Sequence, residues 1–301
     1  MDLTLAQLEA FCKVAELRSF TRAAESLHLA QASLSERISA LESQVGCRLL
    51  DRSGRRTEPT DAGRTLYPLA ARLLRERDAI VSRMLDLAGV KTGIVRVAAG
   101  TVPGEHILPT LLPGFRKRYP GLGVVLEVAS SERVVHLVVE GLADVGFVGS
   151  AGPFRGLDAV PLWDDALVVV VPAGHRWARR KSIPVADLAT EPFVSREQGS
   201  GTSQSFMDRL RSSSRFDGLS LDIVAVMDSS AAVKTAVMSG LGVSVLSSRA
   251  VAAEVQVGLL ASLRLADADL ARKLHLVTSP KRTLSPAARA LVDYVTEQEV
   301  R

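Results

Sequence analysis

Apolar side chains recur at helical spacing three times near the start of the chain. In chain order they are Leu5, Leu8, Phe11, Cys12 and Ala15; Phe20, Ala23, Ala24 and Leu27; and Leu34, Ile38, Leu41 and Val45. Spacings of three and four residues place each set on one face of an α-helix. Ser19 suits the N-cap of the second helix, and Gly46 suits the end of the third. The pattern therefore predicts three short helices, with a turn at His28 and Leu29 before the third.

The outer face of the third helix is polar. Its side chains are Gln31, Ser33, Ser35, Glu36 and Arg37. Such donors and acceptors can read base edges in a DNA major groove. Two helices joined by a tight turn, the second with this face, are typical of a helix-turn-helix, in which Thr21 and Arg22 would lie near the DNA backbone. The alternative is a purely structural three-helix bundle.

Arginines cluster after the third helix. Arg48–Asp51 and Thr57–Pro59 read as two short strands around Ser53-Gly54, and the hairpin between them carries Arg52, Arg55 and Arg56. Arginines at the tip of such a wing can neutralise DNA phosphates or enter a minor groove. A solvated basic face is the alternative.

A long amphipathic helix is predicted next, from about Asp61 to Ala88, with Thr60 as its cap. Its apolar stripe consists of Leu66, Leu73, Ile80 and Leu87 at intervals of seven residues, flanked by Leu69, Ala70 and Met84. A stripe with this period favours a seam between two helices, although the helix can also pack on its own domain. At 1.5 Å per residue, its length is roughly 40 Å.

From Gly93 onward, apolar strands alternate with helical segments, which predicts α/β units. A strand, a pair of serines, a helix and a glycine recur after 99 residues: Ser130-Ser131 corresponds to Ser229-Ser230, and Gly141-Leu142 to Gly240-Leu241. Gly100-Thr101 and Gly201-Thr202 precede the two copies in similar positions. The repeat predicts two similar lobes.

Hydroxyl groups at the starts of helices suggest a small-anion site between these lobes, because helix N-termini favour negative charge. The candidate residues are Gly100, Thr101, Ser130, Ser131, Ser200, Thr202 and Ser229. Simple helix capping is the alternative for each hydroxyl. We expect a small carboxylate or inorganic oxyanion held mostly by neutral donors. Arg196 either supplies a countercharge or pairs with Glu197.

Composition narrows the function classes. Hydrophobic residues make up 47% and charged residues 23% of the 301 residues, which is typical of a folded globular protein. The formal charge of +4 is too small to indicate a nucleic-acid partner by itself. Two cysteines form no disulfide framework, and no apolar run approaches the ~20 residues of a membrane span, so we expect a cytoplasmic protein without membrane contacts.

Signatures of catalysis are missing from the sequence. The five histidines are widely spread without a metal-ligand spacing. The Gly199–Thr202 loop lacks the pattern of a P-loop or a nucleophile elbow. We therefore expect no enzyme activity, no catalytic residues, no metal and no cofactor other than the anionic effector.

The N-terminal stretch LAQLEAFCKVAELRSFTRAAESLHLAQASLSERISALESQVGCRLLDRSGRRTEPTDAG closely resembles the winged helix-turn-helix of LysR-type transcriptional regulators. Ala32 and Glu36 depart from the family pattern, which often has proline and a basic residue there. Glu36 can accept from a cytosine amino group or close a capping box with Ser33, and we favour the capping box. The motifs PLLPGFRKRYPGL, VEGLADVGFV, SREQGSGT and MSGLGVSVLS resemble the family's effector domain, from which Gly100 departs at a position commonly held by serine.

The resemblance implies a multidomain fold. A winged helix-turn-helix domain (1–60), all-α with a small β wing, is followed by a linker helix and hinge (61–92). An α/β effector domain of the type 2 periplasmic-binding-protein kind (93–301) has lobe I at 93–162 and 268–301 and lobe II at 163–267.

The resemblance also implies a function, that of a DNA-binding transcriptional regulator whose promoter binding is modulated by a small anionic effector bound between the two α/β lobes. The implied partners are promoter or operator DNA, a second copy of the chain that binds through the linker helix, and RNA polymerase. The resemblance also implies that dimers assemble into a tetramer. The competing hypothesis is a cytosolic two-lobed binding protein or enzyme without sequence-specific DNA binding.

Overall fold

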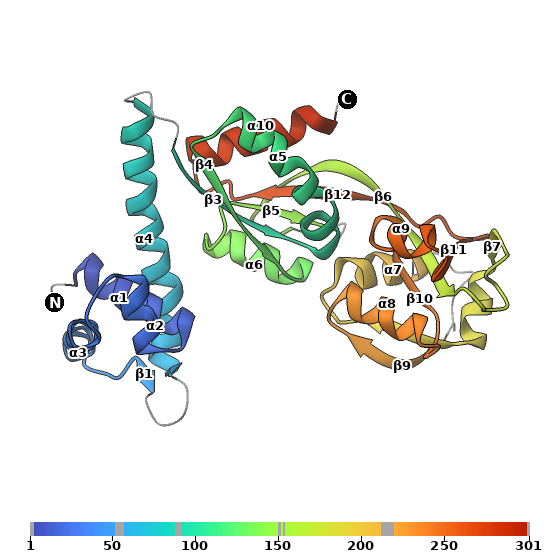
Figure 1. Cartoon of the computed structure of the whole chain (residues 1–301), viewed down its shortest axis with the longest axis horizontal. Coiled ribbons are helices and arrows are strands. Elements are labelled where there is room, and N and C mark those ends of the chain that lie inside the picture. Colours follow the sequence, from blue (N-terminus) through green and yellow to red (C-terminus); the bar gives the residue numbers. More distant parts are fainter. Residues whose placement is uncertain are drawn as a thin grey trace. The chain divides into compact units, whose positions relative to one another are not determined.

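The chain folds into two compact units, Met1–Val90 and Lys91–Arg301 (Figure 1). The computed structural model describes residues 3–51, 57–87, 92–149, 152, 154–211 and 220–299. Within these ranges, no helix combines the length and apolarity needed to cross a membrane.

Unit 1 begins with three helices whose apolar faces meet. They are α1 (Leu5–Leu17), α2 (Phe20–Ser26) and α3 (Gln31–Val45). Phe11, Leu34 and Ile38 are fully buried in their common core. Ser19 caps α2, and Gly46 ends α3 in the left-handed conformation at φ 75°, as the sequence pattern predicts.

One local expectation about α3 is wrong. The N-cap is Ala30, which provides no side-chain cap hydrogen bond. Ser33 and Glu36 both lie inside the helix, so they form no capping box at its N-terminus. The helix begins at Gln31, three residues earlier than it would if Ser33 were the N-cap.

The wing of unit 1 contains a short antiparallel pair, β1 (Leu50–Asp51) and β2 (Glu58–Pro59). Glu42 of α3 fixes the first strand by accepting hydrogen bonds from the backbone N–H groups of Leu49 and Leu50 at 2.8 and 3.2 Å. The tip arginines Arg52, Arg55 and Arg56 lie outside the described residues.

Helix α4 (Asp61–Leu87) follows the wing. The Thr60 hydroxyl accepts from the Gly63 N–H at 3.1 Å and caps its first turn. Ala70 is buried near the N-terminal end of the helix, which packs against α1. Nearby, burial raises the pKa of the Cys12 thiol to about 12, so this cysteine stays a protonated core residue.

Unit 2 is built around an eight-stranded mixed sheet with the order β4-β3-β5-β12-β6-β11-β7, in which β10 also pairs with β6. Its strands are β3 (Gly93–Ala99), β4 (Leu122–Val128), β5 (Val145–Val148), β6 (Asp158–Pro172), β7 (Ser182–Ile183), β10 (Ser244–Ser247), β11 (Leu260–Leu265) and β12 (Ala271–Thr278). A separate parallel pair consists of β8 (Pro192–Arg196) and β9 (Asp222–Met227).

Helices cover these sheets. They are the π-helical turn η1 (Val102–Ile107), α5 (Leu108–Arg118), α6 (Ser131–Glu140), the 3₁₀ segment η2 (Val185–Thr190), α7 (Gly201–Arg211), α8 (Ser230–Met238), α9 (Ser248–Gln256) and α10 (Pro286–Glu299). We call the region of β3, β4, β5, β12, α5, α6 and α10 lobe I, and the region of β7–β11, η2 and α7–α9 lobe II.

Strand β6 belongs to both lobes. Its first half pairs with β12 from Asp158 to Ala166, and its second half pairs with β10 and β11 up to Pro172. Each lobe has its own apolar core, with Phe115 and Phe147 central in lobe I and Trp177 and Phe206 in lobe II. The two lobes therefore share backbone hydrogen bonding while packing separately.

The internal repeat predicted from the sequence is confirmed as a structural repeat. After β4, the Ser130 hydroxyl caps α6, Gly141 ends it at φ 67°, and β5 follows. After β9, the Ser229 hydroxyl caps α8, Gly240 follows at φ 80°, and β10 comes next. Both copies place a serine-capped helix start at the edge of a parallel strand pair.

Candidate functional site

The polar face predicted on α3 is accessible at its N-terminal end. Gln31, Ser33 and Glu36 are exposed, whereas Ser35 and Arg37 are half-buried beside the core stripe. Thr21 and Arg22 of α2 are also exposed. The Thr21 hydroxyl donates to the Gln31 side-chain oxygen at 3.3 Å, which ties the two helices together at this surface.

A small pocket in unit 2 gathers most of the predicted effector residues. Gly100, Thr101, Ser130, Ser131, Ser200 and Thr202 all line it. Ser229 does not line this pocket, and its hydroxyl accepts from the Ala232 N–H at 3.1 Å as a cap of α8. The free volume is about 20 Å³, roughly the space of one water molecule.

Arg196 brings a buried positive charge to this pocket from the end of β8. Its side chain is 3% exposed, and its guanidinium forms an ion pair with Glu197 at 2.9 Å. The guanidinium also donates to the Ser230 hydroxyl at 2.8 Å and approaches the Thr101 hydroxyl of lobe I at 3.4 Å. Arg196 thus pairs with Glu197, one of the two alternatives considered from the sequence, and it also lines the pocket.

Arg272 of β12 lines the same pocket, and its carboxylate partner is Asp165, directly opposite on β6. The Nε atom donates to Asp165 Oδ2 at 2.7 Å, where the two side chains are 7% and 0% exposed. The other Asp165 oxygen accepts from the Ser247 hydroxyl at 2.6 Å. Burial lowers the pKa of Arg272, while Asp165 acts in the opposite direction.

The remaining Arg272 donors connect the two lobes. Nη1 donates to the carbonyl oxygens of Gly149 in lobe I and Gly201 in lobe II, at 3.0 and 2.9 Å, and Nη2 approaches the Thr202 hydroxyl at 3.4 Å. The Ser205 hydroxyl of lobe II also donates to the Gly149 oxygen, at 2.9 Å. The pocket therefore lies where hydrogen bonds cross from lobe to lobe.

Sequence reasoning missed Arg272, Asp165 and Ser205. A signal was present: Asp165 and Arg272 are charged residues next to the apolar runs of two strands, a position where a charge needs a partner. The pairing itself depends on the β6–β12 register across 107 positions of sequence, which no local pattern reveals.

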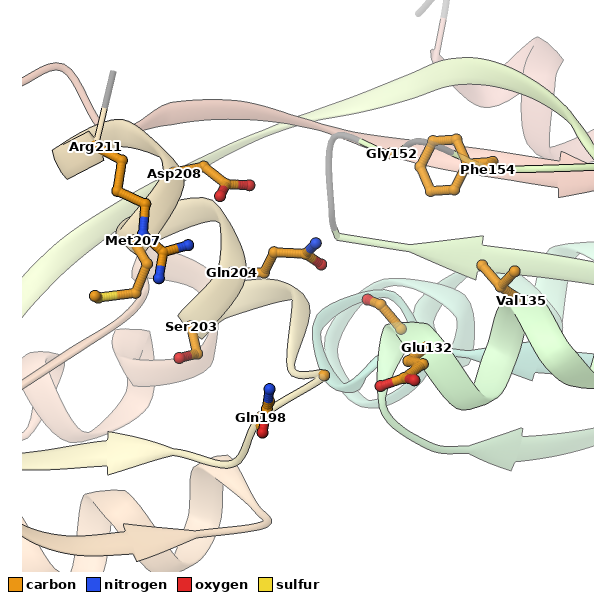
Figure 2. A pocket seen from close by; sticks show the side chains of 12 residues that line it. Glu132, Val135, Gly152, Phe154, Gln198, Ser203, Gln204, Met207, Asp208 and Arg211 are labelled. Atoms are coloured by element: carbon orange, nitrogen blue, oxygen red, sulfur yellow. The ribbon is translucent and has the colours of Figure 1, made fainter. Parts of the chain in front are cut away.

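A larger groove adjoins the pocket. Its volume is about 440 Å³, and Ser131 contributes to both cavities. Figure 2 shows Glu132, Val135 and Phe154 on one side and Ser203, Gln204, Met207 and Asp208 of α7 on the other. The described residues contain no group of His, Cys, Asp or Glu arranged to hold a metal ion.

Comparison with known proteins accounts for both units. Residues 5–64 match the model of the bacterial regulatory helix-turn-helix proteins of the lysR family, and residues 88–299 match the LysR substrate binding domain. The chain belongs to the LysR family. It is a DNA-binding transcriptional regulator with an effector-binding domain, and not an enzyme.

One relative matches the whole chain, and another matches the larger part of it. The RuBisCO operon transcriptional regulator of Allochromatium vinosum is 34% identical, covering 100% of this chain and 98% of its own. The CcmR regulatory domain of Synechocystis PCC6803, solved in complex with 2-PG, is 26% identical with a TM-score of 0.63, covering 69% of this chain and 98% of its own.

A full-length solved structure has the same fold. CbnR complexed with its target DNA is 22% identical with a TM-score of 0.72, covering 98% of this chain and 99% of its own. The winged helix-turn-helix, long helix and α/β effector domain expected from the sequence are thereby confirmed.

Replacing Asp165 by Asn should destabilise unit 2 by about 3–5 kcal/mol, because the buried Arg272 guanidinium loses its countercharge. Both tryptophans, Trp163 and Trp177, lie in unit 2, so denaturant unfolding followed by their fluorescence reports on this unit. Asp164→Asn is the matched control: its carboxylate is 82% exposed and pairs with Lys273 at the surface, so its loss should cost under ~1 kcal/mol. Equal effects of the two substitutions would contradict the structural role of the buried pair.

Proposed function

We propose that a small anion binds in the pocket at Arg196 and Arg272 and thereby alters the DNA binding of this regulator. The observation that carries the proposal is the convergence of six predicted residues and two buried guanidinium groups on one pocket between the lobes. The backbone N–H groups at the starts of α6 and α7 add further donors. The 2-PG complex of the CcmR regulatory domain supports an anionic effector.

An anion in this pocket competes with existing acceptors. Arg272 Nη1 and Nη2 now contact the Gly149 and Gly201 carbonyls and the Thr202 hydroxyl, and an oxyanion is a stronger acceptor than any of these. Redirecting these donors weakens contacts that join the lobes, whereas Asp165 continues to hold Nε. Effector binding would in this way shift the preferred lobe geometry and be coupled to DNA binding.

For DNA binding, we assign contacts with the bases to α3 and contacts with the DNA phosphates to α2 and the wing. The base-reading candidates are Gln31, Ser33, Ser35, Glu36 and Arg37. Thr21, Arg22 and the wing arginines Arg52, Arg55 and Arg56 are the phosphate candidates. The exposure of Thr21, Arg22, Gln31, Ser33 and Glu36 supports the assignment, whereas Ser35 and Arg37 are half-buried.

Self-association is proposed through α4. Leu69, Leu73, Ile80 and Met84 are about half or more exposed along this helix, a stripe that water solvates poorly. Exposed valines on β4 and β9 offer a second surface, through which dimers would form tetramers.

The proposed domain boundaries are 1–60, 61–92 and 93–301, with lobe I at 93–162 and 268–301 and lobe II at 163–267. We place the protein in the cytoplasm.

Gln31→Ala should weaken binding to the DNA upstream of this chain's own coding region by about 5- to 150-fold, because a good base contact contributes roughly 1–3 kcal/mol of discrimination. Affinity for a random duplex should be unchanged when both are measured by fluorescence anisotropy at fixed salt. Ser43→Ala, at the exposed far end of α3, is the control. A parallel loss on both duplexes would assign Gln31 to the backbone instead.

Leu73→Glu combined with Ile80→Glu should convert the assembly to monomers, measured as molar mass by light scattering. Carboxylates in a helix–helix seam would be desolvated without partners. Arg72→Glu changes the net charge by the same two units on an exposed α4 position and should leave the mass unaltered. An unchanged mass in the double variant would place self-association elsewhere.

Thr202→Val should weaken binding of inorganic phosphate and of 2-phosphoglycolate by roughly 10-fold or more, since a hydrogen bond to a charged group contributes about 1.5–3 kcal/mol. Binding is measured by calorimetry, and DNA affinity without ligand should be retained. Thr235→Val, which removes an exposed hydroxyl of α8, is the control. Failure of the unaltered protein to bind either anion would contradict the anion site.

A further inference from the structure

The pocket at the two arginines is too small for more than an ion or the end group of a larger molecule. Its free volume of about 20 Å³ contrasts with about 440 Å³ in the adjoining groove. Ligand pockets in proteins usually measure about 300–1,000 Å³. An organic effector whose oxyanion occupies the pocket must therefore place the rest of its structure in the groove.

The two cavities are adjacent along one stretch of each lobe. Ser131 at the start of α6 lines both of them, and in lobe II the chain passes directly from Gly199 in the groove to Ser200 in the pocket. The Glu132 N–H approaches the Gly199 carbonyl oxygen at 3.5 Å, so the two walls meet at this junction. A ligand bound in both cavities would contact both lobes.

The groove differs from the pocket in charge. Glu132 and Asp208 line it from opposite lobes, against the single guanidinium of Arg211 (Figure 2). Within the described part of the chain, neither carboxylate has a hydrogen-bonding or ionic side-chain partner. In the pocket, by contrast, the lining charges are the two guanidinium groups.

The other groove residues fit a short organic body. Val135, Phe154 and Met207 offer apolar contact, and the amides of Gln198 and Gln204 offer both donors and acceptors. Figure 2 shows Gln204 and Asp208 extending from α7 toward the side on which Val135 and Phe154 lie. Polar and apolar lining of this kind orients a ligand along the groove.

We propose that the effector is zwitterionic, with its oxyanion in the arginine pocket and an ammonium group in the groove at Glu132 and Asp208. The proposal rests on the anion site of the proposed function and specifies the ligand class of that site. The same carboxylates repel a second acidic group, so the chain selects against ligands that are anionic at both ends.

Four phosphate compounds test this selectivity by calorimetry on the full-length protein: phosphoethanolamine, ethyl phosphate, glycerol 3-phosphate and 2-phosphoglycolate. Phosphoethanolamine should bind about 2- to 30-fold more tightly than ethyl phosphate, which lacks only the amino group, because each exposed carboxylate contributes roughly 0.2–1 kcal/mol. 2-Phosphoglycolate should bind more weakly than ethyl phosphate.

Glu132→Gln combined with Asp208→Asn should abolish the preference for phosphoethanolamine without weakening ethyl phosphate binding. Glu140→Gln is the matched control, since Glu140 lies at the other end of α6, outside the groove, where it faces His136. Loss of the preference in Glu140→Gln would show a general charge effect and overturn the assignment to the groove.

The outcomes separate this proposal from the anion site. Equal binding of phosphoethanolamine and ethyl phosphate, or a preference that survives in the double variant, would overturn the zwitterion and leave the anion site standing. A preference for glycerol 3-phosphate over phosphoethanolamine would identify neutral hydroxyl donors in place of the ammonium. If none of the four compounds binds, the anion site itself is wrong.

Discussion

A guanidinium ion buried between two lobes must be neutralised, and the meeting of β6 and β12 provides the means. Arg272 and Asp165 face each other in the strand register, so the ion pair forms wherever these two strands pair correctly. The Asp165 side chain also accepts from Ser247 at the start of α9, which extends the constraint into lobe II. Leaving either charge buried without its partner would cost far more than breaking an ion pair at the surface. The position of the Arg272 guanidinium in the pocket therefore depends on this ion pair.

The Arg272–Asp165 pair fixes the two lobes to each other where β6 and β12 meet, and the contacts between the lobes around this pair are weaker. Contacts from Ser205 to Gly149 and from Arg196 to Thr101 join the lobes through single hydrogen bonds, whose net contributions are about 1 kcal/mol for the neutral donor and at most ~3 kcal/mol for the charged one. An effector needs only a differential affinity of a few kcal/mol to shift such an interface. Because the contacts around the pocket are weaker than the buried ion pair, effector binding can change the lobe geometry without breaking that pair.

Much of this architecture is encoded locally. Ser19, Gly46, Ser130, Gly141 and Ser229 mark helix ends by their own backbone and capping preferences, so the sequence predicts these boundaries without tertiary information. The motif that recurs after 99 residues likewise predicts two similar lobes, because each copy forms the same strand, cap and helix.

Local rules fail where the deciding partner is distant or where two local signals compete. Ser33 and Glu36 have the spacing of a capping box, yet α3 starts at Gln31 and encloses both. Ser229 matches Ser130 in the repeat but lines no part of the pocket, because equivalent positions in two lobes need not face a common space. Arg272 enters the site through a strand pairing that only the folded sheet establishes.

The place of β12 in the sheet has a consequence for the order of events during synthesis. This strand lies between β5 and β6 in lobe I, although more than 90 residues of chain, most of them in lobe II, separate it from β6. A nascent chain that has completed β6 thus has an open gap in the middle of its first lobe, with unpaired strand edges on both sides, until β12 leaves the ribosome. Such edges invite pairing with other chains. Rapid folding of lobe II shortens the loop that β12 must close, and in this sense the second lobe guides completion of the first.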